Sequence, residues 1–216
     1  GTIQFNCENN SHGQQLKPQP HSVGSSAVHT LPNVTGELMP GKIEGTNFTG
    51  SLLVGHATTG TLSSATNNTA VGLTALDALT SGIENTAVGF NAGGAITSGG
   101  RNVAIGRDAL KTATTAATYS TAVGYYSMRD GVGGFGNTGI GYHTLRDVTG
   151  VDNIAIGANA GRNITSGSGN VIIGAYVDAD AVDSARTLKI TGYDGSTATN
   201  WISGDSSGNL TFAADV

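Results

Sequence analysis

The sequence predicts an all-β protein, a trimeric β-solenoid or β-roll whose coils are 16–18 residues long. Three observations predict it. A pentad ending in Gly returns at a nearly constant interval, Gly makes up 34 of the 216 residues beside only 4 Pro, and each pentad is apolar on both faces. An extended N-terminal segment and a C-terminal β-meander are expected to flank the solenoid.

The composition excludes several other classes of protein. Collagen needs Gly at every third residue and abundant Pro, and a helical protein would not hold so much Gly inside its elements, where each costs about 1 kcal/mol relative to Ala. The net charge of −5 is not concentrated in a basic face, so no nucleic acid is expected as a partner. No apolar run approaches the ~20 residues of a membrane helix, so no membrane insertion is expected.

The repeated pentad is clearest at Asn68–Gly72, which reads Asn-Thr-Ala-Val-Gly, and Ser51–Gly55 is a degenerate first copy. The interval from one closing Gly to the next is 17, 17, 17, 18, 17, 16 and 17 residues, counted from Gly55. This period is too short for helical-hairpin repeats and suits one coil of a β-solenoid. The copies begin at Asn68, Asn85, Asn102, Ser120, Asn137, Asn153 and Asn170, and they end at Gly72, Gly89, Gly106, Gly124, Gly141, Gly157 and Gly174.

Within each pentad a short strand places alternate side chains on opposite faces. Both columns that result are apolar, and a thin coil cannot bury both, so we expect the chain to self-associate. The Asn at the corner before each strand is expected to form a ladder of amides, and the closing Gly allows a tight bend or a close backbone approach. One column contains Val71, Val88, Ile105, Val123, Ile140, Ile156 and Ile173, and the other contains Ala70, Ala87, Ala104, Ala122 and Ala155.

The remainder of each coil also repeats. Apolar residues recur four and seven positions after the closing Gly, and a Thr-Ser-Gly turn follows in several coils, a composition typical of tight turns. The fourth positions are Leu76, Leu110, Met128 and Leu145, and the seventh are Leu79, Ile96, Val148 and Ile164.

The flanks differ from the repeats in composition. All four prolines precede residue 41, so residues 1–45 are interpreted as an extended docking or linker segment. Residues 46–178 form the repeat region, and residues 179–216 form a C-terminal strand segment. Within the latter, residues 187–193, 200–203 and 209–213 are strand-like runs separated by turns.

Motifs of enzymatic chemistry occur without their required context. Gly131–Gly136 matches G-x-G-x-x-G, but the pattern fills a corner between coils rather than opening a helix. Gly204–Gly208 matches G-x-S-x-G, but no His follows its Ser. Asp130 and Asp147 share a column one coil apart, which could bring their carboxyl groups to the separation of about 5 Å found in retaining glycosidases. Each follows an Arg, however, which favours a ladder of paired surface charges. We therefore expect no catalysis and no cofactor.

Metal sites are also not expected. Asp178, Asp180 and Asp183 offer the carboxylate oxygens that Ca²⁺ takes, but the Gly and Glu of an EF-hand loop are missing. An exit loop in contact with solvent is the simpler interpretation, and no metal ligand is assigned.

The most distinctive predicted surface lies on the fourth and fifth coils. Aromatic side chains beside Arg suit a carbohydrate or peptide receptor. The alternative, which we favour, is a structural aromatic ladder that packs against a neighbouring chain. The candidate receptor-binding residues are Tyr125, Tyr126, Arg129, Tyr142, His143 and Arg146, with Arg162 in the same column as the other two arginines.

The pentads Asn102–Gly106 and Asn153–Gly157 resemble the repeats of trimeric autotransporter adhesin heads, which are left-handed β-rolls of three chains. The longer coil, with its Ala-Leu and Thr-Ser-Gly elements, is similar to repeats in bacteriophage tail fibres, and so are the segments Gly1–Cys7, His12–Gln14 and Pro20–Ser22. The resemblance covers residues 51–178 well and the ends loosely. It implies a homotrimeric fibre segment of a virion tail. The N-terminal segment would dock on other virion or tail proteins, and the fibre would attach to a host cell-surface glycan or protein.

Three other functions remain open. A bacterial trimeric surface adhesin, located on the cell surface, would share the fold. A polysaccharide depolymerase tailspike would need the paired carboxylates described above. An ice-binding solenoid would need a regular Thr array on one flat face. The array is partial, because the column of Thr69, Thr86, Thr121 and Thr138 is interrupted by Val103, Ile154 and Val171.

Overall fold

The computed structural model describes residues 3–5, 14–16, 41–43, 47–55, 60–114, 118–131 and 134–213. The chain divides into two compact units, Gly1–Glu37 and Leu38–Val216. In the first unit, β1 (Ile3–Phe5) pairs with the antiparallel strand β2 (Gln14–Leu16). Most of the predicted docking segment lies outside the described residues.

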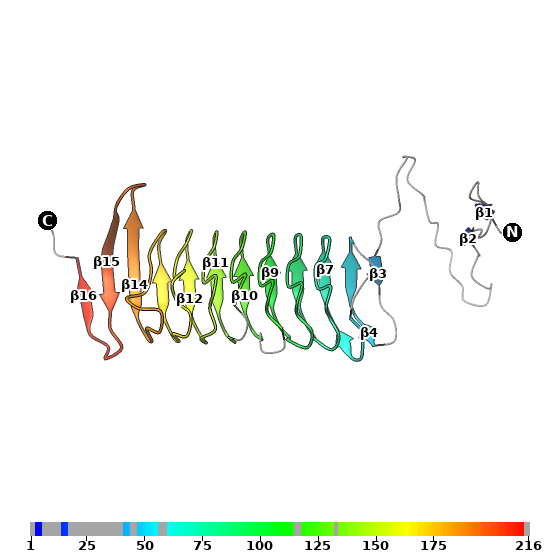
Figure 1. Ribbon diagram of the computed structural model, residues 1–216, viewed down its shortest axis with the longest axis horizontal. Coiled ribbons are helices and arrows are strands. Elements are labelled where there is room, and N and C mark those ends of the chain that lie inside the picture. Colours follow the sequence, from blue (N-terminus) through cyan, green and yellow to red (C-terminus); the bar gives the residue numbers. More distant parts are fainter. Residues whose placement is uncertain are drawn as a thin grey trace. The chain divides into compact units, whose positions relative to one another are not determined.

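The second unit is a β-solenoid in which each coil adds one short parallel strand to a single sheet (Figure 1). Each strand pairs in register with the equivalent strand of the next coil, so that Ala70 lies opposite Ala87 and Val71 opposite Val88. The described residues contain strands and turns, with no helix long and apolar enough to span a membrane. This confirms the all-β solenoid. The parallel strands are β5 (Leu52–Val54), β7 (Thr69–Val71), β8 (Thr86–Val88), β9 (Val103–Ile105), β10 (Thr121–Val123), β11 (Thr138–Ile140), β12 (Ile154–Ile156), β13 (Val171–Ile173) and β14 (Leu188–Tyr193).

Antiparallel strands extend the sheet at both ends. β3 (Gly41–Ile43) pairs with β5, and β15 (Ala198–Gly204) and β16 (Leu210–Phe212) follow β14 as a meander. A small parallel pair, β4 (Phe48–Thr49) and β6 (Ala65–Thr66), lies beside the sheet in the first coil. The parallel stacking therefore continues through β14, past the predicted end at residue 178, because Leu188–Ile190 pairs in register with β13 although it lacks the Asn-to-Gly pentad.

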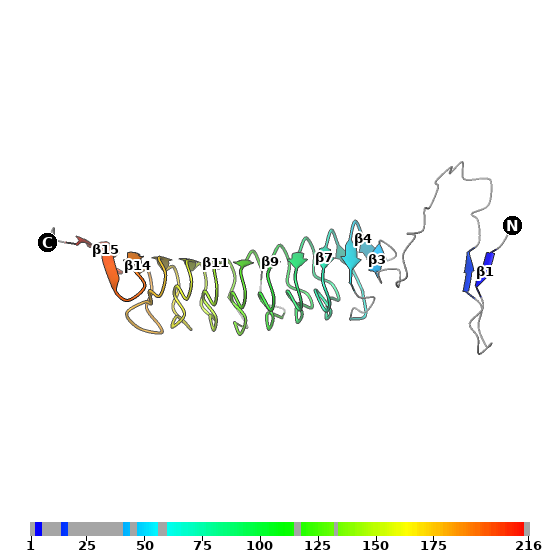
Figure 2. The same ribbon diagram turned by 90° about the horizontal axis from the view of Figure 1, so that it is seen from above.

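The core is narrow and forms between the strands and the turns, which lie along opposite edges of the coils (Figure 2). The middle residue of each strand points inward, and most are fully buried Ala, such as Ala70, Ala122 and Ala155. The turns fill the remaining space with larger side chains four and seven positions after the closing Gly, including Leu76, which is fully buried. Small residues on one wall thus complement large residues on the other, which maintains a close-packed interior.

The first and third residues of each strand form what we call the outer face of the sheet. Val71 is 41% exposed, and Ile105, Ile140 and Ile156 are each 38% exposed. Ile154, in the neighbouring column, is also 38% exposed. The Ala column is therefore the inside of the coil and the Val/Ile column is the outside, so much of the apolar surface remains uncovered in one chain.

The predicted amide ladder is present and buried. Asn85 Nδ2 donates to Asn68 Oδ1 at 3.0 Å, and Asn102 Nδ2 donates to Asn85 Oδ1 at 3.0 Å. Each side chain also satisfies backbone groups, since Asn85 Nδ2 donates to the carbonyl of Gly99 at 3.0 Å. The ladder is interrupted at Ser120, whose buried Oγ has no hydrogen-bond partner among the described residues, and it resumes where Asn153 donates to Asn137.

In one coil, hydrogen-bonded hydroxyl groups take the place of the apolar side chains that fill the core elsewhere. Where the inward Ala of other coils is replaced by Gly139, the buried hydroxyl groups of Ser127 and Thr144 occupy the space. Ser127 Oγ lies 2.8 Å from Thr144 Oγ1 and donates to the carbonyl of Gly139 at 2.9 Å. Both hydroxyls belong to the turns that carry the candidate receptor residues, so these turns are held rigidly against the sheet.

Candidate functional site

Four rings cluster where the fourth and fifth predicted coils turn away from the sheet. Tyr125 and Tyr126 follow Gly124, and Tyr142 and His143 follow Gly141. We call these four residues the aromatic cluster. Parallel pairing of β10 with β11 places the two pairs on adjacent coils.

The rings of the aromatic cluster stack on one another. The ring centroids of Tyr125 and Tyr142 are 5.6 Å apart at an interplanar angle of 10°. Within each coil the rings are closer, at 3.9 Å for Tyr125 and Tyr126 and 4.1 Å for Tyr142 and His143. Positive φ values of 59° at Tyr126 and 56° at His143 allow consecutive side chains to lie side by side.

The aromatic ladder expected from the sequence is present, and its rings stack between adjacent coils of one chain. Its packing against a neighbouring chain stays a prediction. Tyr125 and Tyr142 remain 39% and 49% exposed. Because each ring covers the face of its neighbour, ring edges and hydroxyl groups are presented to solvent. Offset stacking of this kind contributes about 0.5–1.5 kcal/mol per pair.

Guanidinium groups accompany the aromatic rings. The Cζ of Arg129 lies 4.4 Å from the centroid of Tyr126. Arg107, one coil earlier, lies between Phe90 and Tyr125 with its Cζ 5.4 Å and 5.9 Å from their centroids. Arg107 and Phe90 were not among the predicted site residues, although both occupy the first position after a closing Gly, as Tyr125 does.

Asp130 lies between two arginines. Arg129 Nη2 and Arg146 Nε each lie 2.8 Å from Asp130 Oδ2, which makes a charge ladder across two coils. Partial burial acts to raise the pKa of Asp130, but hydrogen bonds from Arg129 and Arg146 outweigh it and hold the pKa below its usual value. The hydrogen bond to Asp130 likewise raises the pKa of Arg129.

The surroundings of Asp130 do not suit the general acid of a glycosidase pair. Asp147 lies 3.9 Å from the same Arg146. A general acid needs a carboxyl group whose pKa is raised so that it holds a proton. Asp130 has a lowered pKa and two guanidinium partners, so its environment supports a structural role rather than proton donation.

The surroundings of His143 lower the pKa of its imidazole and so favour the neutral form. Burial is the main cause of its lowered pKa, and the nearby charges of Arg146, Arg129 and Arg162 act in the same direction. Asp130 opposes the shift. Protonation of His143 would therefore add a cation to a group of cations.

We expect the stability of the protein to decrease on acidification through His143. Since the pKa is lower in the folded than in the unfolded state, the unfolded chain binds more protons as the pH falls below about 6.5, which weakens folding from there down to the folded pKa. His143→Asn, which retains a residue tolerant of positive φ, should lose less stability between pH 7 and pH 5 than the wild type. Urea unfolding at both pH values measures the difference, and identical losses would contradict the assignment.

The enzymatic motifs lie in structural corners. Within Gly131–Gly136, the described residues lead into strand β11 rather than a helix. The segment Gly204–Gly208 forms the turn between β15 and β16, where the Asp205 carboxylate accepts the backbone N–H of Ser207 at 2.9 Å. Neither pattern has the strand-to-helix context of the corresponding active sites.

The predicted carboxylates of the exit loop do not converge. Asp178 Oδ1 accepts the backbone N–H of Asn163 at 3.0 Å, and Asp180 Oδ1 lies 2.7 Å from Lys189 Nζ. Among the residues that the structure describes, no group of three or more His, Cys, Asp or Glu side chains is placed to hold a metal ion.

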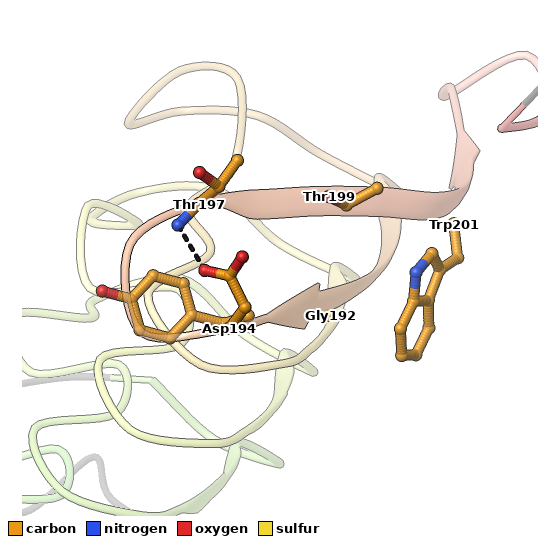
Figure 3. A pocket seen from close by; sticks show the side chains of 6 residues that line it. Gly192, Asp194, Thr197, Thr199 and Trp201 are labelled. Carbon is orange, nitrogen blue, oxygen red and sulfur yellow. Dashed lines mark hydrogen bonds between the residues drawn. The ribbon is translucent and has the colours of Figure 1, made fainter. Parts of the chain in front are cut away.

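A shallow pocket of about 310 Å³ lies at the hairpin of β14 and β15 and was not predicted from the sequence (Figure 3). Trp201 has no partner in the strand register, which shifts between Ile190 and Thr191, and its indole packs over the backbone of Gly192. A β-bulge re-aims a side chain in this way. A Gly inside a strand indicates a close approach of another group. Gly192 was therefore the feature of the sequence from which this packing could have been predicted.

The polar groups of this pocket serve mainly the turn. The carboxylate of Asp194 accepts the backbone N–H groups of Ser196 and Thr197, each at 2.8 Å, and these bonds lower its pKa, that of Thr197 most. Thr199 and Trp201 also line the pocket. The hydrogen bonds of the Asp194 carboxylate are therefore made within the hairpin turn.

Comparison of the chain with protein-family models, with curated proteins and with solved structures finds no match. The functional argument therefore depends on the fold and on the geometry of its surfaces.

Proposed function

We propose that the protein is a structural fibre segment of a virion, most simply a phage tail fibre, that associates as a homotrimer and attaches the particle to a host surface. The observation that carries this proposal is the outer face, where partly exposed apolar side chains such as Val71, Ile105 and Ile140 recur from coil to coil along the sheet. A fibre that holds a particle at a distance from a host surface needs an elongated, rigid fold. The stacked coils of this chain are consistent with that role.

The outer face has the dimensions of a protein interface. Nine parallel strands, from β5 to β14, contribute to it, and at a spacing of about 4.8 Å they extend over roughly 38 Å. Contiguous exposed apolar patches larger than a few hundred Å² are uncommon on monomers and mark interaction sites. Because the repeats are in register, an identical chain offers a surface of the same length and period. The number of three chains rests on the resemblance to trimeric fibres.

The aromatic cluster, with Arg129 and Arg146, is the proposed receptor-binding surface. It lies on the turns after the closing Gly, apart from the outer face, so trimerisation and attachment use different surfaces. The proposed docking of other virion proteins falls to the N-terminal segment, most of which lies outside the described residues. A bacterial trimeric adhesin would use the same surfaces and differs only in the body that carries the fibre.

Self-association is tested by placing a charge on the outer face. We expect light scattering to give a trimeric mass for the wild type and a monomeric mass for Ile140→Lys, because an interface cannot bury an unpaired ammonium group. Leu73→Lys is the matched control, since Leu73 is 56% exposed and lies beyond Gly72, off the outer face. A monomeric wild type, or equal disruption by both variants, would contradict the proposed interface.

A further inference from the structure

We propose that the receptor is a linear acidic polysaccharide that lies along the solenoid axis, bound by a column of cations on four consecutive coils. This inference rests on the attachment function proposed above and names the chemical class of its ligand. The cationic column consists of Lys111, Arg129, Arg146 and Arg162.

The column is a property of the repeat. Each of its residues comes five positions after a closing Gly, and the same position in flanking coils is Asp77, Gly94 or Ala179. Backbone hydrogen bonds hold the coils in line, since Thr112 N donates to the carbonyl of Arg129 at 3.1 Å and Asp130 N donates to that of Arg146 at 2.8 Å. The cations therefore repeat at the coil spacing of about 4.8 Å.

Three of the four cations in the column form ion pairs with carboxylates of the same chain. The side chain of Asp108 is 4% exposed and lies 3.4 Å from Lys111 Nζ and 3.2 Å from Arg107 Nε, whereas those two side chains are 44% and 56% exposed. Asp130 pairs with Arg129 and Arg146, but there the side chains are similarly exposed, at 28%, 25% and 33%. At Asp108 the anion is the buried partner. In both places the ion pairs hold the cations in position, which reduces the entropy lost on binding.

Arg162 differs from the other three. It is exposed and makes no ion pair or hydrogen bond among the residues that the structure describes. Asp178, on the next coil, uses its carboxylate to accept the backbone N–H of Asn163 at 3.0 Å. A free guanidinium at the end of a line of partly neutralised cations is available for a carboxylate or phosphate of a ligand.

The spacing and charge favour an acidic polysaccharide. The coil spacing is close to the length of one pyranose residue, so successive acidic sugars would meet successive coils. Tyr hydroxyl groups and ring edges of the aromatic cluster are within the same turns and can bond sugar hydroxyls. Four carboxylates, those of Asp108, Asp130, Asp147 and Asp178, share the surface with five cations, the four of the column and Arg107, and the whole chain is acidic at −5. This low net charge suits a polymer with one carboxylate per sugar better than duplex DNA, whose charges are spaced by about 1.7 Å.

The test measures binding of polygalacturonate to the full chain by calorimetry. We expect binding that weakens as salt is raised, because exposed charges are screened. Fully methyl-esterified polygalacturonate has the same backbone without the charge and should bind at least tenfold more weakly. Arg162→Gln should weaken binding of the acidic form about fivefold, the scale of one exposed ion pair.

Arg186→Gln is the matched control. Arg186 is exposed and also makes no ion pair among the described residues, but it lies at the corner before strand β14. We expect it to leave binding unchanged, and an equal loss in both variants would overturn the site. Equal binding of the esterified polymer, or preferred binding of a single-stranded oligonucleotide, would overturn the ligand class. Light scattering on the same samples separates this outcome from failure of the trimer, since a trimer that does not bind refutes only the polysaccharide.

Discussion

Gly89→Ala is expected to remove about 2–6 kcal/mol from the free energy of unfolding, through backbone strain and overpacking together. Gly89 closes a strand with φ at +131°, a conformation that L side chains rarely adopt. A Cβ there would lie 2.7 Å from the carbonyl oxygen and 2.8 Å from the carbonyl carbon of Gly106 on the next coil. Because the obstacle is backbone, neither coil can give way without breaking the stack.

Gly195→Ala separates the two causes. Gly195 also has a positive φ, +102°, but a Cβ there would meet nothing within 4 Å. Only backbone strain of about 1–3 kcal/mol is expected. Chemical denaturation followed by circular dichroism, at one protein concentration, measures both variants. Losses of the same size would show that the close approach between coils does not restrict the closing position.

Asn85→Ala is expected to cost about 2–5 kcal/mol, because several buried groups lose their partners at once. Asn85 Oδ1 accepts from the backbone N–H of Asn102 at 3.1 Å and from its side chain at 3.0 Å. Its Nδ2 donates to Asn68 and Gly99. Urea unfolding measures the loss, and a change below about 0.5 kcal/mol, the usual effect of a surface substitution, would refute the ladder as a stabilising element.

The reverse change tests the same element. Ser120 occupies the Asn position of its coil, and its buried Oγ has no hydrogen-bond partner among the described residues. Ser120→Asn should restore a rung and stabilise the protein by about 1 kcal/mol, the net value of a typical intramolecular hydrogen bond. A destabilised variant would show that this corner cannot accommodate the amide that the other corners hold.

Much of the candidate site could be predicted from column positions alone. Tyr125 and Tyr142 share a position in the repeat, and in-register parallel pairing made them neighbours, as expected. The sequence could not show that the rings would stack within one chain. That result depends on the positive φ of Tyr126 and His143, which is imposed by the path of the turn rather than by the residue types.

The ends of the solenoid show a further limit. The strand β14 has no Asn-to-Gly pentad, yet Leu188, Lys189 and Ile190 pair in parallel with β13. A parallel sheet can add a further strand wherever its edge is free and an extended segment of suitable length follows. The Asn-to-Gly pentad is needed only where the coil turns tightly. The packing of Trp201 over Gly192 likewise follows from a bulge, which shifts the register between β14 and β15. The sequence predicted that both segments are strands, but it did not predict this register.

The amino-acid sequence by itself determined the coil, its period and the residues that occupy equivalent positions, because a closing Gly at 16–18-residue steps is compatible with few backbones. It also predicted the amide ladder. Only the tertiary structure decided which apolar face lies inside. The turns place Leu, Ile and Met side chains against the sheet, and the inward position of most facing strands is then occupied by Ala. The larger Val and Ile side chains therefore face outward, and with them the surface on which the proposed assembly depends.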